Sequence, residues 1–117
     1  MLAADRLLEI EEKFGAAVQR IVPTELDEAT LRVTVYLRDG SNLRVTEQWE
    51  IGELKRYSYY WLTSGNELKI GWDNAPHHTQ LERFPHHKHI ERHNNLQPSE
   101  ETCLEQVMGV ILRGKKA

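Results

Sequence analysis

The sequence predicts an α+β fold in which a single four-stranded antiparallel meander carries a helix at each end of the chain. Three observations predict it: helical spacing of apolar residues at the start, period-two alternation through the middle, and a second helical stripe near the end. A chain of 117 residues is long enough for one hydrophobic core but short for two. We therefore expect residues 1–117 to form a single domain.

The first expected element is an amphipathic helix from Ala4 to Val22. Polar residues separate apolar positions that recur at helical spacing. These apolar positions are Leu7, Ile10, Phe14, Ala17, Val18 and Ile21. Pro23 follows directly, and because a proline disfavours helical conformation in the residue before it, we expect the helix to end there.

Four runs of alternating residues follow, and each is expected to be a strand. They cover residues 31–38, 43–50, 55–62 and 68–73. Asp39-Gly40 is a strong turn signal after the first run, and Ser64-Gly65-Asn66 separates the last two. Because short turns join antiparallel neighbours, we expect the strands to follow one another across the sheet.

Residues 74–98 show no clear period and contain prolines and all the histidines. A long loop in a compact domain is usually functional or disordered, so we expect a histidine-rich functional loop here. A second helix is then expected to begin at Pro98-Ser99-Glu100-Glu101, with Ser99 capping its first amides. Its apolar stripe consists of Leu104, Val107, Met108, Ile111 and Leu112, and Gly114 ends it.

The composition argues against several classes of protein. The net charge of −3 gives no strong overall attraction to nucleic acid or lipid, so any anion site must be local. One cysteine, Cys103, excludes an internal disulfide framework and suits a reducing compartment. The sequence has neither an apolar run of membrane-spanning length nor the pattern of a signal peptide. We expect a cytoplasmic protein that does not associate with membranes.

The six histidines all lie between His77 and His93, and Pro-His-His occurs twice. One interpretation is a zinc or nickel site that combines imidazoles with Asp73 or Glu47. The second is acid–base chemistry on a phosphodiester, with nearby cations holding the phosphate. The third is structural packing or a pH-sensitive binding surface. For one histidine the structural interpretation is the better one, but for the whole cluster we favour a functional site.

Glu47 breaks the pattern of its strand, because its neighbours on the same face are apolar. A carboxylate facing a core must be paired, hydrogen-bonded or protonated. A β-bulge or an edge position explains Glu47 about as well as a functional role. Asp73 ends the fourth predicted strand where the histidine loop begins, and its alternative role is to cap a turn.

The third predicted strand interleaves a cation with aromatic residues, a pattern on which unpaired bases can stack. Aromatic residues are also ordinary in sheets, and one phase of the strand must face the core. The candidate nucleic-acid-binding residues are Arg56, Tyr57, Tyr59 and Arg83.

The segments RYSYYW, GWDNAPHH and FPHHKH, followed by a helix opened by PSEE, resemble the TumE family of toxins from prokaryotic toxin–antitoxin pairs. The resemblance implies a small cytoplasmic toxin that is neutralised by an antitoxin protein from the neighbouring gene. The residues of the family motif are Asp73, His77, His78, His86, His87, Lys88 and His89. Ribonuclease activity is implied because small toxins of this kind commonly cleave RNA.

We therefore expect an endoribonuclease that uses no metal or other cofactor, with a catalytic site made of the motif residues and Glu47. One of His86 and His87 would take the 2′-hydroxyl proton, and His78 or His89 would protonate the leaving oxygen. Lys88 and Arg56 would steady the phosphate. The alternatives are a metal-dependent nuclease and a non-enzymatic module that binds a partner protein. The sequence does not decide between a monomer and a homodimer.

Overall fold

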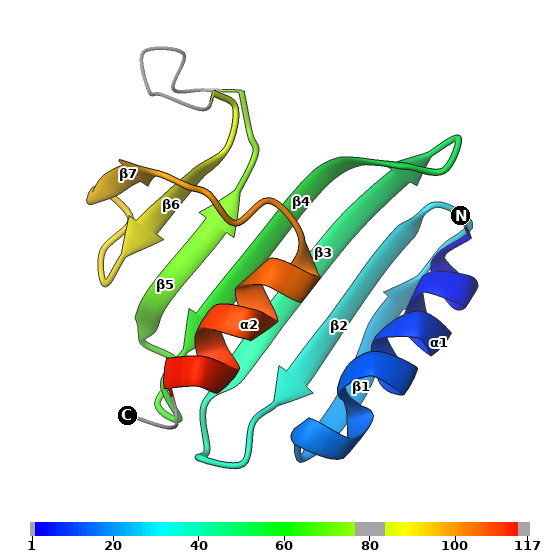
Figure 1. Ribbon diagram of the computed structural model, residues 1–117, viewed down its shortest axis with the longest axis horizontal. Coiled ribbons are helices and arrows are strands. Elements are labelled where there is room, and N and C mark those ends of the chain that lie inside the picture. Colours follow the sequence, from blue (N-terminus) through cyan, green and yellow to red (C-terminus); the bar gives the residue numbers. More distant parts are fainter. Residues whose placement is uncertain (1, 77–83, 115–117) are drawn as a thin grey trace.

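The computed structural model describes residues 2–76 and 84–114, which form one seven-stranded antiparallel sheet with two helices on one of its faces (Figure 1). The strands lie in the sheet in the order in which they occur in the chain. They are β1 (Arg20–Leu26), β2 (Thr30–Tyr36), β3 (Asn42–Glu50), β4 (Glu53–Leu62), β5 (Leu68–Asp73), β6 (His87–Ile90) and β7 (Leu96–Pro98). The helices are α1 (Ala3–Phe14) and α2 (Leu104–Gly114), and a 3₁₀ turn, Gly15–Ala17, follows α1.

The predicted four-stranded sheet is wrong, although the chain is α+β overall and each of the four predicted strands is present as β2 to β5. The additional strands are β1, β6 and β7. They extend the sheet on both sides of the predicted meander, so β2 and β5 lie inside the sheet and are not its edges.

Strand β1 occupies residues that were predicted to end the first helix. Helix α1 ends at Phe14, and Ile21 and Val22 pair with β2 in extended conformation. Both residues are β-branched, which favours a strand over a helix. Pro23 is tolerated because β1 is an edge strand, where a missing amide proton costs no ladder hydrogen bond. The proline therefore belongs to the strand, and the expected helix of 4–22 is too long.

Strands β6 and β7 lie within the segment that was predicted to be a loop. Their register pairs His87 with Asp73 on one side and with Pro98 on the other. The alternation in β6 is hidden in the sequence, because the face carrying His87 and His89 is polar. Pro98 is again on an edge strand, as Pro23 is.

Helix α2 begins at Leu104, several residues after the predicted start. The Ser99 side chain does not cap it, because the Ser99 hydroxyl donates to the carbonyl of Glu101 at 2.8 Å. The Gln106 side chain instead accepts from the backbone amide of Thr102 at 2.7 Å, just before the helix. The polar residues at 99–102 thus form a connection that leads from β7 to the helix.

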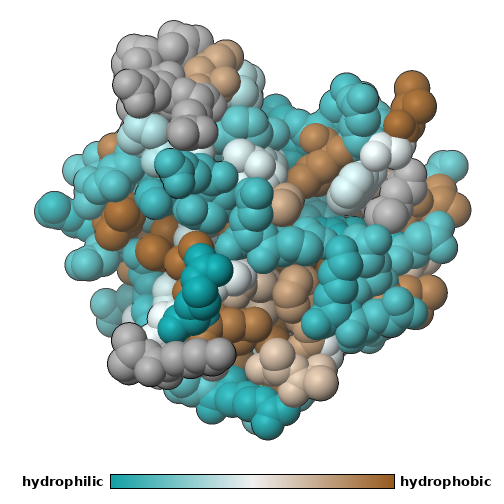
Figure 2. All heavy atoms as spheres, viewed as in Figure 1, coloured by the Kyte–Doolittle hydropathy of each residue, from teal (hydrophilic) through white to brown (hydrophobic). Residues whose placement is uncertain are grey.

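The two faces of the sheet differ in character. The face covered by α1 and α2 carries the apolar phase of the strands, which forms the core together with the inner sides of both helices (Figure 1). The buried core residues of the strands include Leu31, Val33, Val35, Leu43, Val45, Tyr57, Tyr59 and Trp72. The outer surface on this side is largely hydrophilic, with hydrophobic atoms visible between the two helices (Figure 2). We call the opposite face, to which Thr46 and Ser58 belong, the open face.

Among the described residues, neither helix is both long enough and apolar enough to cross a membrane.

Candidate functional site on the open face

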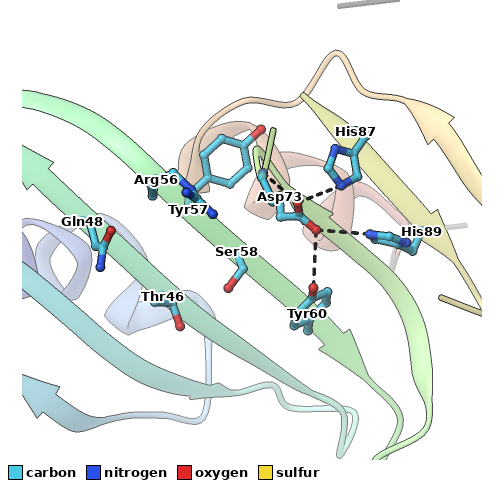
Figure 3. A pocket seen from close by; sticks show the side chains of 10 residues that line it. Thr46, Gln48, Arg56, Tyr57, Ser58, Tyr60, Asp73, His87 and His89 are labelled. Carbon is cyan, nitrogen blue, oxygen red and sulfur yellow. Dashed lines mark hydrogen bonds and ion pairs between the residues drawn. The ribbon is translucent and has the colours of Figure 1, made fainter. Parts of the chain in front are cut away.

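Asp73, His87 and His89 form a compact cluster at one end of the open face (Figure 3). Nε2 of His87 lies 2.7 Å from Oδ1 of Asp73, and Nε2 of His89 lies 3.1 Å from Oδ2 of the same carboxylate. The exposed fractions of the three residues are 6%, 3% and 8%, respectively. A single carboxylate therefore bridges two nearly buried imidazoles.

The sheet register brings these residues together. Asp73 is the cross-strand partner of His87, and Gly71 is the partner of His89. Cross-strand partners point to the same face, so β5 and β6 deliver all three side chains to the open face. The cluster thus depends on the pairing of β5 with β6.

Gly71 is needed for a second contact at the cluster. The ring of Tyr60, its partner in β4, lies over it, so a Cβ atom at position 71 would come within 2.2 Å of Cδ1 of Tyr60. The Tyr60 hydroxyl points to Asp73 and donates to Oδ2 at 3.4 Å, which is a long hydrogen bond. Burial, reinforced by the charge of Asp73, raises the pKa of Tyr60, so this hydroxyl keeps its proton.

Backbone groups orient the three side chains of the cluster. Nδ1 of His87 lies 3.0 Å from the carbonyl oxygen of Pro85, and Nδ1 of His89 lies 2.7 Å from that of His93. The backbone amide of Ala75 donates to Oδ1 of Asp73 at 3.0 Å. Asn74 fixes the chain directly after Asp73, because its side chain accepts from the amide of Tyr57 at 2.9 Å and donates to the carbonyl of Lys55 at 3.0 Å.

A cavity of about 530 Å³ lies beside the cluster. Its walls come from β3, β4 and β5 as well as β6, and Figure 3 shows how the side chains surround it. The lining residues are Thr46, Gln48, Arg56, Tyr57, Ser58, Tyr60, Asp73, Ala75, His87 and His89. Hydroxyls, an amide and a guanidinium therefore face the same space as the Asp73 carboxylate.

Several of these lining residues were not singled out in the sequence, namely Thr46, Gln48, Ser58 and Tyr60. Thr46 is the cross-strand partner of Ser58, which in turn is the partner of Asp73. The alternation of side chains along each predicted strand could have identified them. It places these residues on the same face of the sheet as Arg56 and Asp73.

His86 and Lys88 do not join the cluster. Lys88 pairs with Trp72, which places it on the helix-covered face, and its Nζ lies 3.6 Å from Oε1 of Glu101. Nδ1 of His86 lies 2.9 Å from the hydroxyl of Tyr57. Burial, together with the charge of His87, lowers the pKa of His86. His77, His78 and Arg83 lie outside the described residues.

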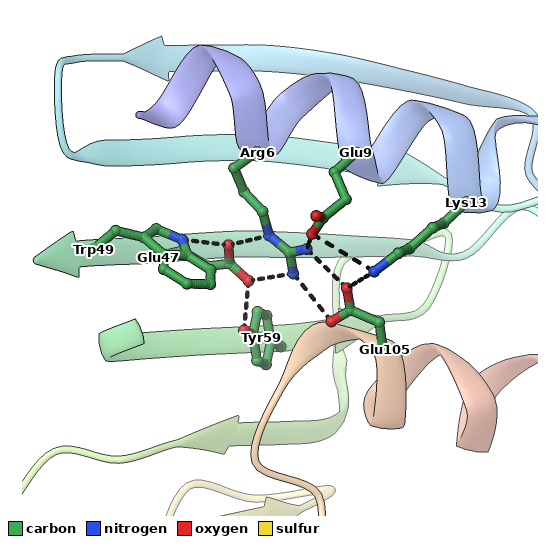
Figure 4. Close-up of polar contacts among 7 residues, drawn as sticks. All are labelled: Arg6, Glu9, Lys13, Glu47, Trp49, Tyr59 and Glu105. Carbon is green, nitrogen blue, oxygen red and sulfur yellow. Dashed lines mark hydrogen bonds and ion pairs between the residues drawn. The ribbon is translucent and has the colours of Figure 1, made fainter. Parts of the chain in front are cut away.

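Glu47 lies on the face of the sheet opposite to the cluster, beneath the helices (Figure 4). It is fully buried, and both of its oxygens accept hydrogen bonds from Arg6, at 2.8 Å and 3.1 Å. The Tyr59 hydroxyl donates to it at 2.6 Å and Trp49 Nε1 at 3.0 Å. The carboxylate is therefore paired, as its position requires, but the structure does not bring it to Asp73.

Arg6 connects this pair to both helices. Its guanidinium also contacts Glu9 in α1 and Glu105 in α2, the latter at 2.8 Å and 3.2 Å. Burial alone would lower the pKa of Arg6, but the hydrogen bonds that Arg6 donates to Glu47 and Glu105 raise it, so the guanidinium stays charged. The Glu47 network thus holds α1 and α2 on the sheet.

The predicted nucleic-acid-binding residues are divided between the two faces. Arg56 is exposed and lines the cavity. Tyr59 is fully buried on the helix-covered face. Tyr57 is nearly buried on that face, but an edge of it reaches the cavity. Tyr59 is therefore not accessible to a base.

Four arginines share the open face, one on each of the strands β1 to β4. They are Arg20, Arg32, Arg44 and Arg56, and all are exposed. Arg20 stacks over the Tyr36 ring at 4.4 Å, and Arg32 pairs with Glu25 at 2.9 Å. The open face thus presents four guanidinium groups, of which that of Arg32 is offset by Glu25.

A family model described as Toxin TumE matches residues 4–114. The match covers nearly the whole chain, from α1 through the cluster to α2, and it confirms the resemblance inferred from the sequence motifs. No curated protein and no solved structure matches the chain.

Proposed function

The chain belongs to the TumE toxin family, and on this basis we propose that it is a toxin that cleaves RNA in the cavity of the open face. The observation that carries the proposal is that the Asp73–His87–His89 cluster and Arg56 line the same cavity. Phosphodiester cleavage needs groups that move protons or stabilise developing charge next to a cation that holds the phosphate.

The arginines of the open face support RNA as the substrate. Cations spread over a surface neutralise successive phosphates, and this sequence-independent term supplies much of nucleic-acid affinity. Arg20, Arg32 and Arg44 lie on successive strands that lead to Arg56 and the cavity. The phosphates of a single-stranded RNA that lies across β1 to β4 would contact these arginines on the way to the Asp73–His87–His89 cluster.

The sequence left open which histidines act as base and as acid, and the residues that line the cavity support one choice for each role. Of the two histidines considered as base, His87 lines the cavity. Of the two considered as acid, His89 lines it, and His78 lies outside the described residues. Both lining histidines are therefore assigned to the reaction, and Arg56 takes the phosphate-holding role without Lys88, which lies on the other face. These histidines act on the phosphodiester either directly, as acid and base, or as ligands of a metal ion.

A toxin family implies an antitoxin partner. We assign this role to the protein encoded by the neighbouring gene, and its binding blocks either the cavity or the arginines of the open face.

The test is RNA cleavage by the purified full-length chain, compared among three variants. His89→Ala removes part of the cluster and Arg56→Ala removes the cation beside it. Lys55→Ala is the matched control, because Lys55 is adjacent in sequence but outside the cavity, paired with exposed Glu53 at 2.9 Å. We expect a loss of at least about a hundredfold for His89→Ala, a smaller loss for Arg56→Ala and none for Lys55→Ala.

Growth inhibition in cells should follow the same order, with melting curves confirming that each variant is folded. If folded His89→Ala remains as toxic as the wild-type chain, the cavity is not the site of toxicity. The non-enzymatic alternative, a module that binds a partner protein, would then be preferred.

A further inference from the structure

With neutral imidazoles and an ionised carboxylate, the contacts between Asp73, His87 and His89 pair acceptors with acceptors. Nδ1 of His87 and Nδ1 of His89 each face a backbone carbonyl oxygen, which can only accept, so each Nδ1 must carry a proton. In a neutral imidazole the other nitrogen, Nε2, is then an acceptor. Both Nε2 atoms nevertheless face oxygens of the Asp73 carboxylate, which are also acceptors.

Protons alone resolve this mismatch poorly. A proton on the Asp73 carboxyl group could be donated to only one of the imidazoles. Protons on both Nε2 atoms would complete the hydrogen bonds but would leave a net charge of +1 on the cluster, with ring centroids 5.1 Å apart and almost no exposure to water. Two like charges at this distance repel each other strongly when solvent does not screen them.

We propose that Asp73, His87 and His89 bind a divalent transition-metal ion, with zinc as the representative ion. A single ion between the carboxylate and both Nε2 lone pairs would satisfy all three groups at once. The candidate ligand atoms lie within 4.8 Å of one another, and the cluster is the one such group among the described parts of the chain.

The distances suit such an ion. Zinc bonds imidazole nitrogen and carboxylate oxygen at about 2.0–2.2 Å, so tetrahedral ligands lie roughly 3.3 Å apart. The two observed Nε2–oxygen distances are 2.7 Å and 3.1 Å, so a small outward movement of the side chains makes room. Two imidazoles with one carboxylate favour zinc, iron, nickel or copper over magnesium, which prefers oxygen ligands alone.

The surroundings have the arrangement that metal sites usually show. A metal-binding imidazole normally donates its second nitrogen to a carbonyl or carboxylate, which fixes its tautomer and its orientation. The carbonyls of Pro85 and His93 do this here, and the Ala75 amide orients the carboxylate. The cluster therefore carries oriented ligands and the groups that orient them.

Three protein ligands leave at least one coordination position open, and the cavity of about 530 Å³ lies next to it. A bound ion would supply positive charge to a phosphate oxygen there. That consequence for catalysis rests on the proposed function, whereas metal binding itself rests only on the cluster.

The experiment is calorimetric titration of the untagged full-length chain with ZnCl₂, after stripping with EDTA and dialysis. We expect one zinc ion per chain with a dissociation constant in the micromolar range or below, and no comparable heat with MgCl₂. The absorption spectrum of the chain with Co²⁺ should show nitrogen and oxygen coordination. Absence of saturable binding at one ion per chain, or equally tight magnesium binding, would overturn the inference.

Variants then identify the ligands. Loss of a group that only orients a ligand weakens metal binding by about 10–100-fold, so His89→Ala and Asp73→Asn should weaken it by at least that much. His93→Ala is the matched control, because it removes an exposed imidazole 5.8 Å from the ring of His89 while keeping the carbonyl that His89 contacts. An equal loss of affinity in His93→Ala would refute the ligand set.

Failure of this inference differs from failure of the proposed function. Zinc binding without RNA cleavage leaves the metal site intact and refutes the ribonuclease. Cleavage at full rate by a chain that does not bind zinc in the titration refutes the metal site and leaves the ribonuclease, with His87 and His89 acting directly.

Discussion

Arg6 and Glu47 form a two-point ion pair between α1 and β3, with both side chains almost fully buried. Four further side chains hydrogen-bond to the pair. Arg6 also donates to Glu9 and Glu105, and Glu47 also accepts from Trp49 and Tyr59. Because the two partners are 41 positions apart in the sequence, the pair forms only when the helix docks on the sheet.

The first prediction concerns the stability that this pair confers. Glu47→Gln should destabilise the fold by about 3 kcal/mol, because removal of one partner leaves a buried charge poorly compensated. Urea unfolding followed by circular dichroism measures the change. Glu25→Gln, which breaks an exposed pair with Arg32, is the control and should cost less than about 1 kcal/mol. A fully stable Glu47→Gln chain that has lost RNA cleavage would restore Glu47 to the catalytic site.

The second prediction concerns the pH dependence of stability. Burial alone would raise the pKa of Glu105, but hydrogen bonds from Arg6 and Lys13 outweigh it and lower the pKa from 4.5 to about 2. Because the folded pKa lies below the unfolded value, the stabilisation is present above pH 4.5 and is lost as the pH falls towards 2. Melting temperatures of the wild-type chain and Glu105→Gln should therefore converge over this range. Parallel curves would show that Glu105 is not paired in solution.

The third prediction concerns the contact between Gly71 and Tyr60. Gly71→Ala should cost about 1–3 kcal/mol, because the added Cβ would collide with the Tyr60 ring at 2.2 Å. Combining it with Tyr60→Ala should recover part of the loss, since the colliding ring is then absent. Gly65→Ala is the control, because its nearest neighbour is 3.8 Å away. Additive losses in the double variant would contradict the predicted collision.

The fourth prediction concerns the open face as an RNA-binding surface. Arg44→Ala should lower the slope of log affinity against log salt by about 0.7, the value for one phosphate contact with single-stranded RNA. Fluorescence anisotropy with a labelled oligonucleotide measures the slope in a cleavage-deficient His89→Ala background. Lys55→Ala should leave it unchanged. If Arg44→Ala and Lys55→Ala give the same salt dependence of affinity, the open face does not bind RNA.

The parts of the fold that could be predicted are those with a regular apolar period. Strands β2 to β5 were found because Leu31, Val33 and Val35, and their counterparts in the later runs, alternate with polar residues. Strand β1 was missed because Ile21 also continues the helical spacing of Val18, and Pro23 resembles a helix terminator. Its position at the sheet edge, next to a register shift between Pro23 and Glu25, makes that proline compatible with a strand.

The candidate site could be predicted in part. Asp73, His87 and His89 were selected because the histidines are clustered and Asp73 ends a strand beside them. The register of β5 and β6, which determines which imidazoles reach Asp73, could not be predicted from a segment without an apolar period. Glu47 was correctly expected to need a partner, but Arg6 could not be identified because the pairing depends on how α1 packs.

The prolines of β1 and β7 have a consequence for assembly. Each outer strand of the sheet lacks a backbone proton at Pro23 or Pro98, and β7 is only three residues long. Interrupted or short borders resist the docking of a further strand, whether from a misfolded neighbour or from an extended peptide. We therefore expect neither edge of the sheet to accept a further strand readily, either from a second copy of the chain or from a partner protein.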